Sequence, residues 1–444
     1  MNGRALLGLL EEKLRFVATH DAVTGLLSGP VLVKMLDEAL ARNGSPSVLV
    51  IVMDGLYHHG EHHGLLAGEH VLRTVAKRLS QVIGPGETLA RIEGEIFAAL
   101  TFDPQPEALA DRLCAAIRAP VPWGSVELHL AAGAGIVTSR GDWASGEAMV
   151  PAGYSAARAA LRLDRRGGVS TFTDDMRRRM VRETCIEDRL WLAIAGNHLK
   201  LVMQPKVRAG DGRILGAEAL VRWQDEVLGA VSPSEFIPVA ERSGIIGDLT
   251  AWVMRGALAQ AARWRAAGLH LSVAVNVSAV DLRQPNFVGM VGDFIADSGC
   301  EPRRLMLELT ESCLADDPEH AADQFRALKK MGVSLALDDF GTGYSSLSQL
   351  RRFPIDTLKI DQSFVSGIPA DGGAVAIART IIALARSFGM ETVAEGVETT
   401  DQARILRQLG VDLLQGFLFS RPISTDAFAA MVGNTPEGAL AAAS

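Results

Sequence analysis

The feature that most constrains the fold of this chain is a series of short apolar segments in its second half. Each segment is followed by a stretch with helical periodicity. The segments begin at Leu201, Gly216, Leu271, Leu305, Ser334, Thr357, Glu391 and Leu413. Eight such strands within about 240 residues match the size and strand count of a (β/α)8 barrel. A doubly wound open sheet of similar size is the alternative that this rhythm leaves open.

Most of these segments carry a hydrogen-bonding or ionisable residue inside or just beyond the apolar run. These residues are Gln204, Glu218, Asn276, Glu308, Asp338, Asp339, Lys359, Glu395 and Gln415. A barrel interior is normally filled with branched apolar side chains, so a buried carboxylate is costly unless it is paired or binds a metal. A single residue of this kind can be a buried polar group whose hydrogen bonds are all made. Five carboxylates spread over the ends of several strands instead predict an active site at the carboxyl ends of the strands.

The residue types in this set predict the chemistry of the site. Carboxylate and amide oxygens without Cys or His favour Mg²⁺ or Mn²⁺. One carboxylate of the adjacent Asp338–Asp339 pair can bridge two ions about 4 Å apart, as in phosphoester hydrolysis. Lys359 then orients a metal-bound water, or alternatively it only pairs with the acidic residues. Arg222, just after the strand that carries Glu218, is placed to hold a phosphate.

Composition narrows the class of ligand and the compartment. A formal net charge of −8 argues against a polymeric nucleic acid as partner, because such a partner needs a basic face, but it leaves open a small anionic ligand. The four cysteines show no paired or metal-binding spacing, which is typical of reduced thiols in a cytoplasmic protein. No apolar run approaches the roughly 18 residues of a membrane span.

We expect two domains joined by helix. Residues 1–18 have the spacing of an amphipathic helix that packs on its own domain or on a second copy of the chain. Residues 19–174 alternate helices and strands, with a strand at 48–53, a hairpin over 88–101 and more strand at 126–138. The hairpin turn is expected at Glu93-Gly94. This pattern indicates an α/β domain. The remaining divisions are a connecting helix at 175–190, the barrel at 191–434 and a tail at 435–444.

The second domain resembles the EAL-domain cyclic di-GMP phosphodiesterases. The motifs that carry the resemblance, in family order, are Glu218-Ala-Leu220 with Arg222, Asn276-Val-Ser, Glu308-Leu-Thr-Glu311, Asp338-Asp-Phe-Gly-Thr-Gly343, Lys359-Ile-Asp, Glu395-Gly-Val-Glu398 and Gln415-Gly-Phe. The series spans the whole domain. The resemblance implies a modified (β/α)8 barrel in which one strand runs antiparallel, and hydrolysis of cyclic di-GMP to linear pGpG.

The resemblance also implies a role for each matching residue. One metal ion would be held by Glu218, Asn276, Glu308 and Asp338, and a second by Asp338, Asp339 and Glu395. Lys359 would position the attacking water. The dinucleotide would contact Gln204, Leu220, Arg222 and Gln415, and Glu311 would hold the loop that follows Asp339. Glu218 and Glu395 would serve catalysis together with Lys359 and Glu311.

The first domain resembles the GGDEF diguanylate cyclase family in a degenerate form. Asp21-Ala-Val-Thr-Gly-Leu26 matches the family's opening motif, and Glu93-Gly-Glu-Ile-Phe97 stands at its signature hairpin. Glu93 replaces a glycine that lets the backbone approach nucleotide phosphates. Ile96 replaces an acid, and Val52 replaces the first metal-binding aspartate. We therefore expect no cyclase activity from this domain.

Four further expectations concern the histidines, GTP binding, the oligomeric state and an alternative to catalysis. His58, His59, His62 and His63 have helical i, i+4 spacing suited to a transition metal, but a solvent-facing helix explains them as well. A subsidiary hypothesis is that the first domain still binds GTP and regulates the barrel, with Glu95 as the motif residue in its favour. We also expect the chain to form a homodimer. The alternative to an enzyme is a cyclic di-GMP receptor that does not catalyse and signals through the N-terminal helices.

Overall fold

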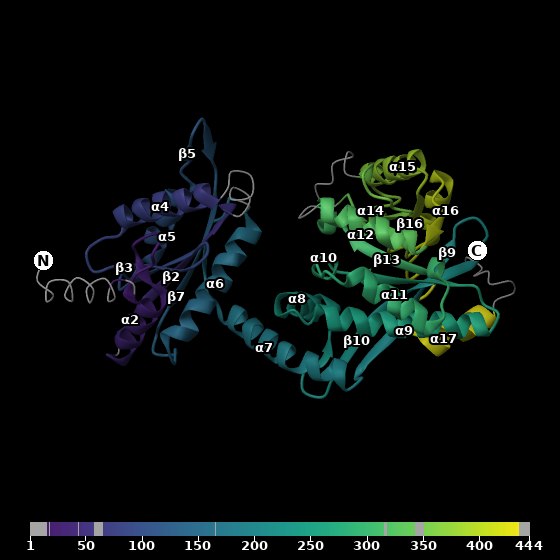
Figure 1. Ribbon diagram of the computed structural model, residues 1–444, viewed down its shortest axis with the longest axis horizontal. Helices are drawn as coiled ribbons and strands as arrows, with labels where there is room; N and C mark the ends of the chain where they lie inside the picture. The colour runs from purple at the N-terminus through teal and green to yellow at the C-terminus, as the bar shows by residue number, and fades with distance from the viewer. Residues whose placement is uncertain are drawn as a thin grey trace, which may run out of the picture. The chain divides into compact units, whose positions relative to one another are not determined.

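The computed structural model describes residues 16, 18–42, 44–56, 65–164, 166–314, 318–341 and 350–434. The chain divides into two compact units, Met1–Arg182 and Glu183–Ser444, and the boundary falls within helix α7 (Asp174–Ala195) (Figure 1). Most of the helix expected over 1–18, the histidines at 58–63 and the tail at 435–444 lie outside the described residues.

The first unit is built on a six-stranded sheet. Its strand order is β1 (Leu27–Ser28), β3 (Thr88–Glu93), β4 (Ile96–Thr101), β2 (Ser47–Asp54), β7 (Ala131–Thr138) and β8 (Val169–Thr171). A separate ribbon pairs β5 (Val121–Trp123) with β6 (Val126–Leu128). The predicted strand at 48–53 is confirmed, and the segment predicted at 126–138 is divided between β6 and β7.

Helices cover both faces of this sheet because its central strand is apolar on both faces. In β2, Leu49 and Ile51 belong to one buried cluster and Val48 and Val50 to another, as the alternation of side chains along a strand requires. The first cluster packs on α4 (Leu65–Val82) and α5 (Pro106–Arg118), and the second on α2 (Gly29–Ala41) and α6 (Gly146–Leu163). The first unit is therefore a three-layer α/β/α domain.

The predicted hairpin is confirmed with a small shift of its turn. Strands β3 and β4 pair antiparallel, and the two turn residues are Gly94 and Glu95 rather than Glu93 and Gly94. Gly94 has φ +44°, a backbone conformation that glycine adopts readily. Glu93 therefore ends a strand instead of lying in the turn.

The second unit is a closed barrel. Neighbouring strands in the ring are β10 (Ile214–Asp225), β12 (Ser272–Val277), β13 (Leu305–Thr310), β14 (Ser334–Phe340), β15 (Thr357–Ile360), β16 (Glu391–Ala394), β17 (Leu413–Leu414) and β9 (Leu199–Arg208). Pairing of β9 with β10 closes the ring, which excludes the open sheet. Two short strands, β11 (Gly229–Val231) and β18 (Ile423–Ser424), pair beside it.

One strand of the ring runs against the others, as the family resemblance implies. Strand β9 is antiparallel to both of its neighbours, β10 and β17, whereas the pairs from β10 through β17 are parallel. The final strand is shorter than the apolar run 413–418 predicts. From Gln415 onward the backbone bonds to the segment after β16, because Val397 N donates to Gln415 O at 3.0 Å and Leu418 N to Val397 O at 2.9 Å.

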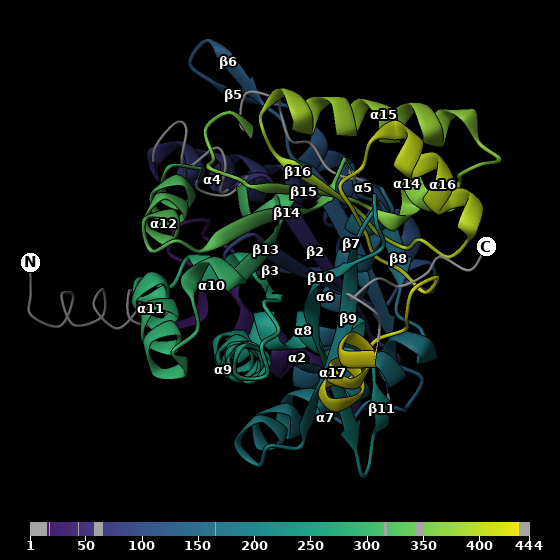
Figure 2. The same ribbon diagram turned by 90° about the vertical axis from the view of Figure 1, so that its right-hand side faces the viewer.

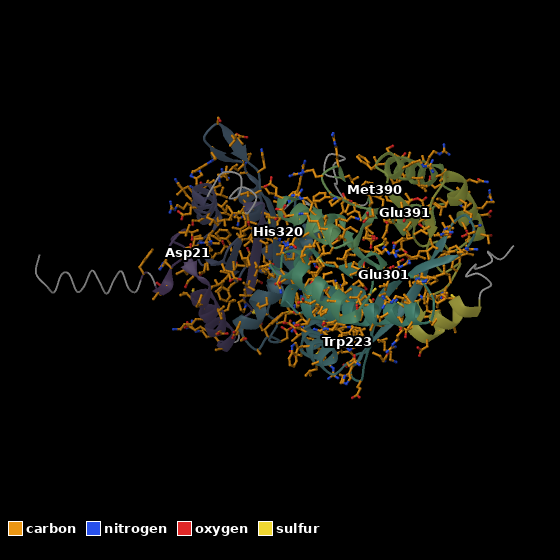
Figure 3. The ribbon with its side chains drawn as sticks, turned by 45° about the vertical axis from the view of Figure 1, so that its right-hand side comes forward. Asp21, Trp223, Glu301, His320, Met390 and Glu391 are labelled. Atoms are coloured by element: carbon orange, nitrogen blue, oxygen red, sulfur yellow. The ribbon has the colours of Figure 1, made fainter. Side chains whose placement is uncertain are left out.

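Helices surround the parallel strands of the barrel (Figures 1 and 2). They are α8 (Pro233–Ser243), α9 (Ile246–Ala266), α10 (Ala279–Leu282), α11 (Phe287–Ser298), α12 (Pro318–Lys330), α14 (Gln362–Ser366), α15 (Gly372–Ser387), α16 (Thr400–Leu409) and α17 (Thr425–Asn434). Local sequence sets their ends: Ser232 and Glu235 form a capping box at the start of α8, and Gly244 ends it with φ +80°. Glu301 and Glu391 in Figure 3 mark the amino ends of β13 and β16, opposite the predicted site.

Candidate active site

Lys359 is the centre of a buried ring of carboxylates at the carboxyl ends of the barrel strands. Its ammonium on β15 lies 2.9 Å from Glu308 Oε2 on β13, 3.0 Å from Asp338 Oδ2 on β14 and 2.6 Å from Glu395 Oε1 just after β16. The lysine side chain is 1% exposed. Four residues that are distant in the sequence thus meet because parallel strands bring their carboxyl ends to one edge.

A second buried lysine, which the sequence analysis missed, joins the same ring. Lys206 on β9 donates a short hydrogen bond to Glu308 Oε1, so the two oxygens of Glu308 are bound by different lysines. The available signal was a charged residue three positions after the apolar run that begins at Leu201. The orientation of that residue depends on strand pairing across the barrel.

An amide network holds the other side of the ring. Glu218 on β10 accepts hydrogen bonds from Asn276 Nδ2 and Gln415 Nε2, both at 2.6 Å. Gln415 Nε2 also lies 3.1 Å from Gln204 Oε1 on β9. Gln415 Oε1 is buried and has no hydrogen-bond partner among the described residues, so one acceptor atom of this side chain is unsatisfied.

The second of the two adjacent aspartates at the end of β14 has a strained backbone. Asp339 has φ +52°, an uncommon conformation for a non-glycine residue, and the pairing register shifts between Leu337 and Phe340. Its backbone N–H donates to Asp338 Oδ1 at 2.9 Å. Strain of this kind clusters at functional sites, where the surrounding structure compensates for it.

Among the described residues, Asp338, Asp339 and Glu395 form the one group of three acidic, His or Cys side chains that is compact enough for a metal ion. One ligand atom from each lies within 4.8 Å of the others. Their oxygens are the donors that Mg²⁺ and Mn²⁺ prefer, so the donor set fits the ions that the sequence predicts.

The electrostatics of the ring show too little positive charge for its carboxylates. Burial raises the pKa of Glu395 to about 8 although Lys359 opposes the shift. Burial and the neighbouring Asp338 raise the pKa of Asp339 to about 6. Burial would also raise the pKa of Glu308, but Lys206 and Lys359 lower it to about 2. The uncompensated negative charge therefore lies toward Asp339 and Glu395, and it suits added cations.

A polar pocket of about 270 Å³ opens over the ring. Its walls include Gln204, Glu218, Leu220, Arg222, Asp338, Lys359, Glu395 and Gln415, all predicted site residues. Phe417, which is 47% exposed, also lines it and was missed as a site residue. The pocket brings predicted residues from several strands and strand ends to one surface.

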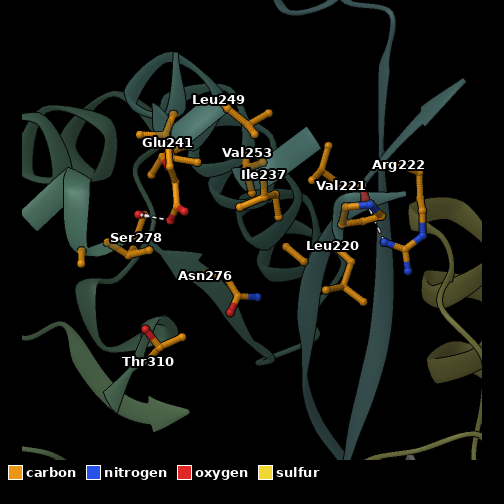
Figure 4. A pocket seen from close by; sticks show the side chains of 16 residues that line it. Leu220, Val221, Arg222, Ile237, Glu241, Leu249, Val253, Asn276, Ser278 and Thr310 are labelled. Carbon is orange, nitrogen blue, oxygen red and sulfur yellow. Dashed lines mark hydrogen bonds between the residues drawn. The ribbon is translucent and has the colours of Figure 1, made fainter. Parts of the chain in front are cut away.

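An apolar pocket of about 270 Å³ adjoins the polar one and shares Leu220 and Arg222 with it (Figure 4). Side chains of Ile237, Leu249 and Val253 from α8 and α9 form much of its wall. Its few polar side chains are those of Glu241, which accepts a hydrogen bond from Ser278, and of Arg222, Thr250, Asn276 and Thr310. Such a pocket fits a flat ring better than a phosphate.

Glu311 lies in the 3-10 turn η2 (Glu311–Leu314), directly after β13. The loop that we expect it to hold begins at Gly341, and residues 342–349 lie outside the described part of the chain. Its proposed role therefore stays a prediction. Arg222 lies at the edge of both pockets, where its Nη1 donates to Val221 O at 2.8 Å.

The corresponding part of the first unit is apolar or solvent-exposed. Val52 is 4% exposed and pairs with Ile96 on one side and Gly133 on the other. Glu93 and Asp54 are exposed. The hairpin is fixed by Arg91, whose guanidinium donates to Gly94 O and binds Asp21 at 3.0 Å.

Comparison with known proteins places these two units in named families. The EAL domain family matches residues 187–422, and the diguanylate cyclase GGDEF domain family matches residues 18–162. The chain is 38% identical over 97% of its length to an uncharacterized signaling protein of Caulobacter vibrioides, and 33% identical over 94% to the cyclic di-GMP phosphodiesterase PdeR of Escherichia coli. It spans 54% and 64% of those two relatives.

A solved structure agrees with the barrel. The PaMucR phosphodiesterase in complex with c-di-GMP is 38% identical, and the match covers 55% of this chain and 99% of that one with a TM-score of 0.53. The second unit is thus an EAL barrel with an acidic site at its strand ends. This chain belongs to the EAL domain family and carries a GGDEF domain ahead of the EAL domain. No helix in the described residues has the length and apolarity to cross a membrane.

Proposed function

We propose that this chain hydrolyses cyclic di-GMP to linear pGpG in the polar pocket of its barrel. The observation that carries the proposal is the ring in which Lys359 contacts Glu308, Asp338 and Glu395 at the carboxyl ends of the strands. The name of the relative PdeR and the solved complex of the PaMucR phosphodiesterase with c-di-GMP support the substrate.

The donor atoms of the ring support two Mg²⁺ or Mn²⁺ ions. We propose that one ion is held by Glu218, Asn276, Glu308 and Asp338 and the other by Asp338, Asp339 and Glu395, with the compact acidic group supporting the second set. Such ions supply charge stabilisation and a reactive hydroxide when they are bound. The raised pKa values of Asp339 and Glu395 support this assignment, because both mark uncompensated negative charge.

The protein's own groups orient the reactants. In this proposal the ammonium of Lys359 donates to the attacking water and holds it against the phosphorus. The P–O3′ bond breaks, the 3′ oxygen takes a proton, and the product keeps a 5′ phosphate. Arg222 and Gln204 bind the phosphate and sugar edge of the dinucleotide, and Gln415 completes that wall of the pocket.

The apolar pocket supports a site for one guanine base. It begins at Leu220 and Arg222, where the polar pocket ends, so a dinucleotide with its phosphate over the ring can extend a base into it. Ile237 and Leu249 would contact the faces of the base, which accounts for the apolar wall.

Product analysis tests the function directly. Purified protein with Mn²⁺ or Mg²⁺ is expected to convert cyclic di-GMP to pGpG, and chelation is expected to stop the reaction until the ion is restored. Glu218→Ala should abolish turnover, whereas Glu226→Ala, on a residue of the β10–β11 connection, should leave it unchanged. Binding of cyclic di-GMP without any product after long incubation would overturn the proposal and favour a receptor.

We further propose that the first unit makes no cyclic di-GMP from GTP. Val52 supplies no metal ligand, and Glu93 adds bulk and negative charge beside the hairpin turn. Regulation by GTP and homodimer formation stay predictions. If GTP changes neither the phosphodiesterase rate nor the melting temperature, the expectation that this unit binds GTP is wrong.

A further inference from the structure

Lys206 is a buried cation that the motif series leaves without a role. It lies on β9 and is 3% exposed. Its Nζ donates to Glu308 Oε1 and lies 3.9 Å from Met306 Sδ, both on β13. Strands β10 and β12 lie between β9 and β13 in the barrel wall, so the lysine side chain reaches across the interior of the barrel.

The position of Lys206 is beneath the site rather than in the pocket. Met306 precedes Glu308 by two residues, so its side chain is on the same face of β13 and one layer deeper in the barrel. The ammonium therefore contacts Glu308 from the amino-terminal side. Lys359 binds the other oxygen of Glu308, and Lys359 lines the polar pocket.

Core stability does not explain a lysine at this position. Taking an ammonium out of water is costly, and a buried ion pair is often no more stable than apolar residues of similar volume. Met306 shows that an unbranched apolar side chain is accommodated in the same layer. The positive charge of Lys206 is therefore the property that needs an explanation.

The balance of charge supplies that role. When all are ionised, the five carboxylates Glu218, Glu308, Asp338, Asp339 and Glu395 exceed the two lysines by three negative charges. Two divalent cations then leave these seven groups with one positive charge, the sign that attracts a phosphodiester. Without Lys206 the same loaded ring is neutral and attracts an anion less strongly.

We propose that Lys206 is a positioning residue that fixes Glu308 by one oxygen and weakens the hold of the ring on divalent cations, so that the loaded site keeps a net positive charge for the phosphodiester. The inference rests on the proposed function for the identity of the substrate. This role differs from a purely structural one in the expected effect of removing the charge: metal affinity should rise rather than fall or stay the same.

Calorimetric titration of the full chain with Mn²⁺, without any nucleotide, tests that sign. Lys206→Met keeps most of the side-chain volume and removes the charge, so it is expected to bind Mn²⁺ about tenfold more tightly than the wild type. Lys330→Met removes one exposed charge from the same unit and should not change Mn²⁺ affinity. Weaker or unchanged Mn²⁺ binding by Lys206→Met would overturn the proposal.

The steady-state parameters supply the second measurement. With saturating Mn²⁺, Lys206→Met is expected to raise KM for cyclic di-GMP about tenfold, because the loaded site has lost one positive charge. An unchanged KM would also overturn the proposal. If Lys206→Met does not fold, Lys206→Gln carries the same predictions and keeps a donor to Glu308, and failure of both variants to fold would show a structural requirement instead. If the wild type binds Mn²⁺ without hydrolysing cyclic di-GMP, the proposed function fails while the titration still decides the role of Lys206.

Discussion

The two units treat acidic residues at their strand ends in opposite ways. In the barrel, Glu308 is 1% exposed and both of its oxygens are bound by lysine ammonium groups. In the first unit, the corresponding central strand ends in Val52-Met53-Asp54, where the valine is buried and the aspartate is exposed. The fold thus keeps the strand-end carboxylate Glu308 inside the barrel where it also supplies cations, and that pairing separates the unit with a candidate site from the unit without one.

The largest test of this comparison removes one aspartate from each unit. Asp339→Asn is expected to lower the rate of cyclic di-GMP hydrolysis by at least about a thousandfold, because it removes one carboxylate of the proposed metal group. Asp54→Asn in the first unit is expected to leave the rate unchanged, since that carboxyl group is exposed at the end of β2. Product formation by both variants is measured at saturating metal. Full turnover by Asp339→Asn would contradict the two-metal assignment.

A second test places a carboxylate where the first unit lacks one. Val52→Asp introduces an unpaired charge into the buried strand β2 and is expected to lower the free energy of unfolding of this unit by about 3–5 kcal/mol. Val126→Asp, on a valine that is 44% exposed in the same unit, should cost no more than about 0.5 kcal/mol. Urea unfolding measures both. Recovery of the lost stability on addition of Mg²⁺ would show that the unit still forms a metal site.

Local pattern was sufficient to predict most of the fold. Alternating apolar segments and helices predicted the barrel strands, and the hairpin around Gly94 followed from its strand pattern. That one barrel strand is antiparallel came only from the family resemblance, because the residues of a strand do not record its direction, and the structure identifies this strand as β9. The early end of β17 was missed because it follows from a long-range approach: a Cβ on Gly416 would lie 2.1 Å from Val397 O.

The candidate site likewise contains residues that local sequence predicts and residues that only long-range contacts define. Glu308, Asp338 and Lys359 were found from sequence because each is polar in an apolar run, and the structure brings them together. Lys206 was missed because its contact with Glu308 depends on which residues face each other across the closed ring. The apolar pocket was missed for a similar reason, since its wall combines ordinary core residues of α8 and α9 with β10.

A third test concerns packing in the first unit. A Cβ on Gly135 of β7 would lie 1.9 Å from Gly153 O and 2.5 Å from Ala157 N, both in the backbone of α6. Gly135→Ala must therefore push the helix from the sheet and is expected to lower the free energy of unfolding by about 1–3 kcal/mol. A Cβ on Gly168 meets no atom of the described residues within 4 Å, so Gly168→Ala should be close to neutral. Equal melting temperatures for the two variants would mean that this helix moves away from the sheet without cost.

The smallest expected effect is on the pH dependence of stability, where one carboxyl group of the first unit is compared with one of the barrel. Burial would raise the pKa of Asp21, labelled in Figure 3, but hydrogen bonds from Thr24 and the charge of Arg91 hold it below its ordinary value of 3.8. Burial, with repulsion from Glu241, raises the pKa of Asp281 above that value despite hydrogen bonds from Thr250 and Ser278.

The two shifts have opposite signs in the linkage between protons and folding. A lowered pKa means that Asp21 contributes stability above its unfolded pKa, and this stability is lost as the pH falls. A raised pKa means that the folded barrel holds the proton of Asp281 more tightly than the unfolded chain, so stability falls as the pH rises through that range.

Asp21→Asn should therefore remove part of the acid sensitivity of the first unit, and Asp281→Asn should make the barrel relatively more stable toward neutral pH. Urea unfolding followed by hydrogen exchange in peptides from each unit, between about pH 3 and pH 6, separates the two slopes, and Asp248→Asn on an exposed carboxyl of α9 serves as the control. Slopes that change in the same direction for both variants would mean that net charge, rather than the surroundings of each carboxyl group, sets the pH response.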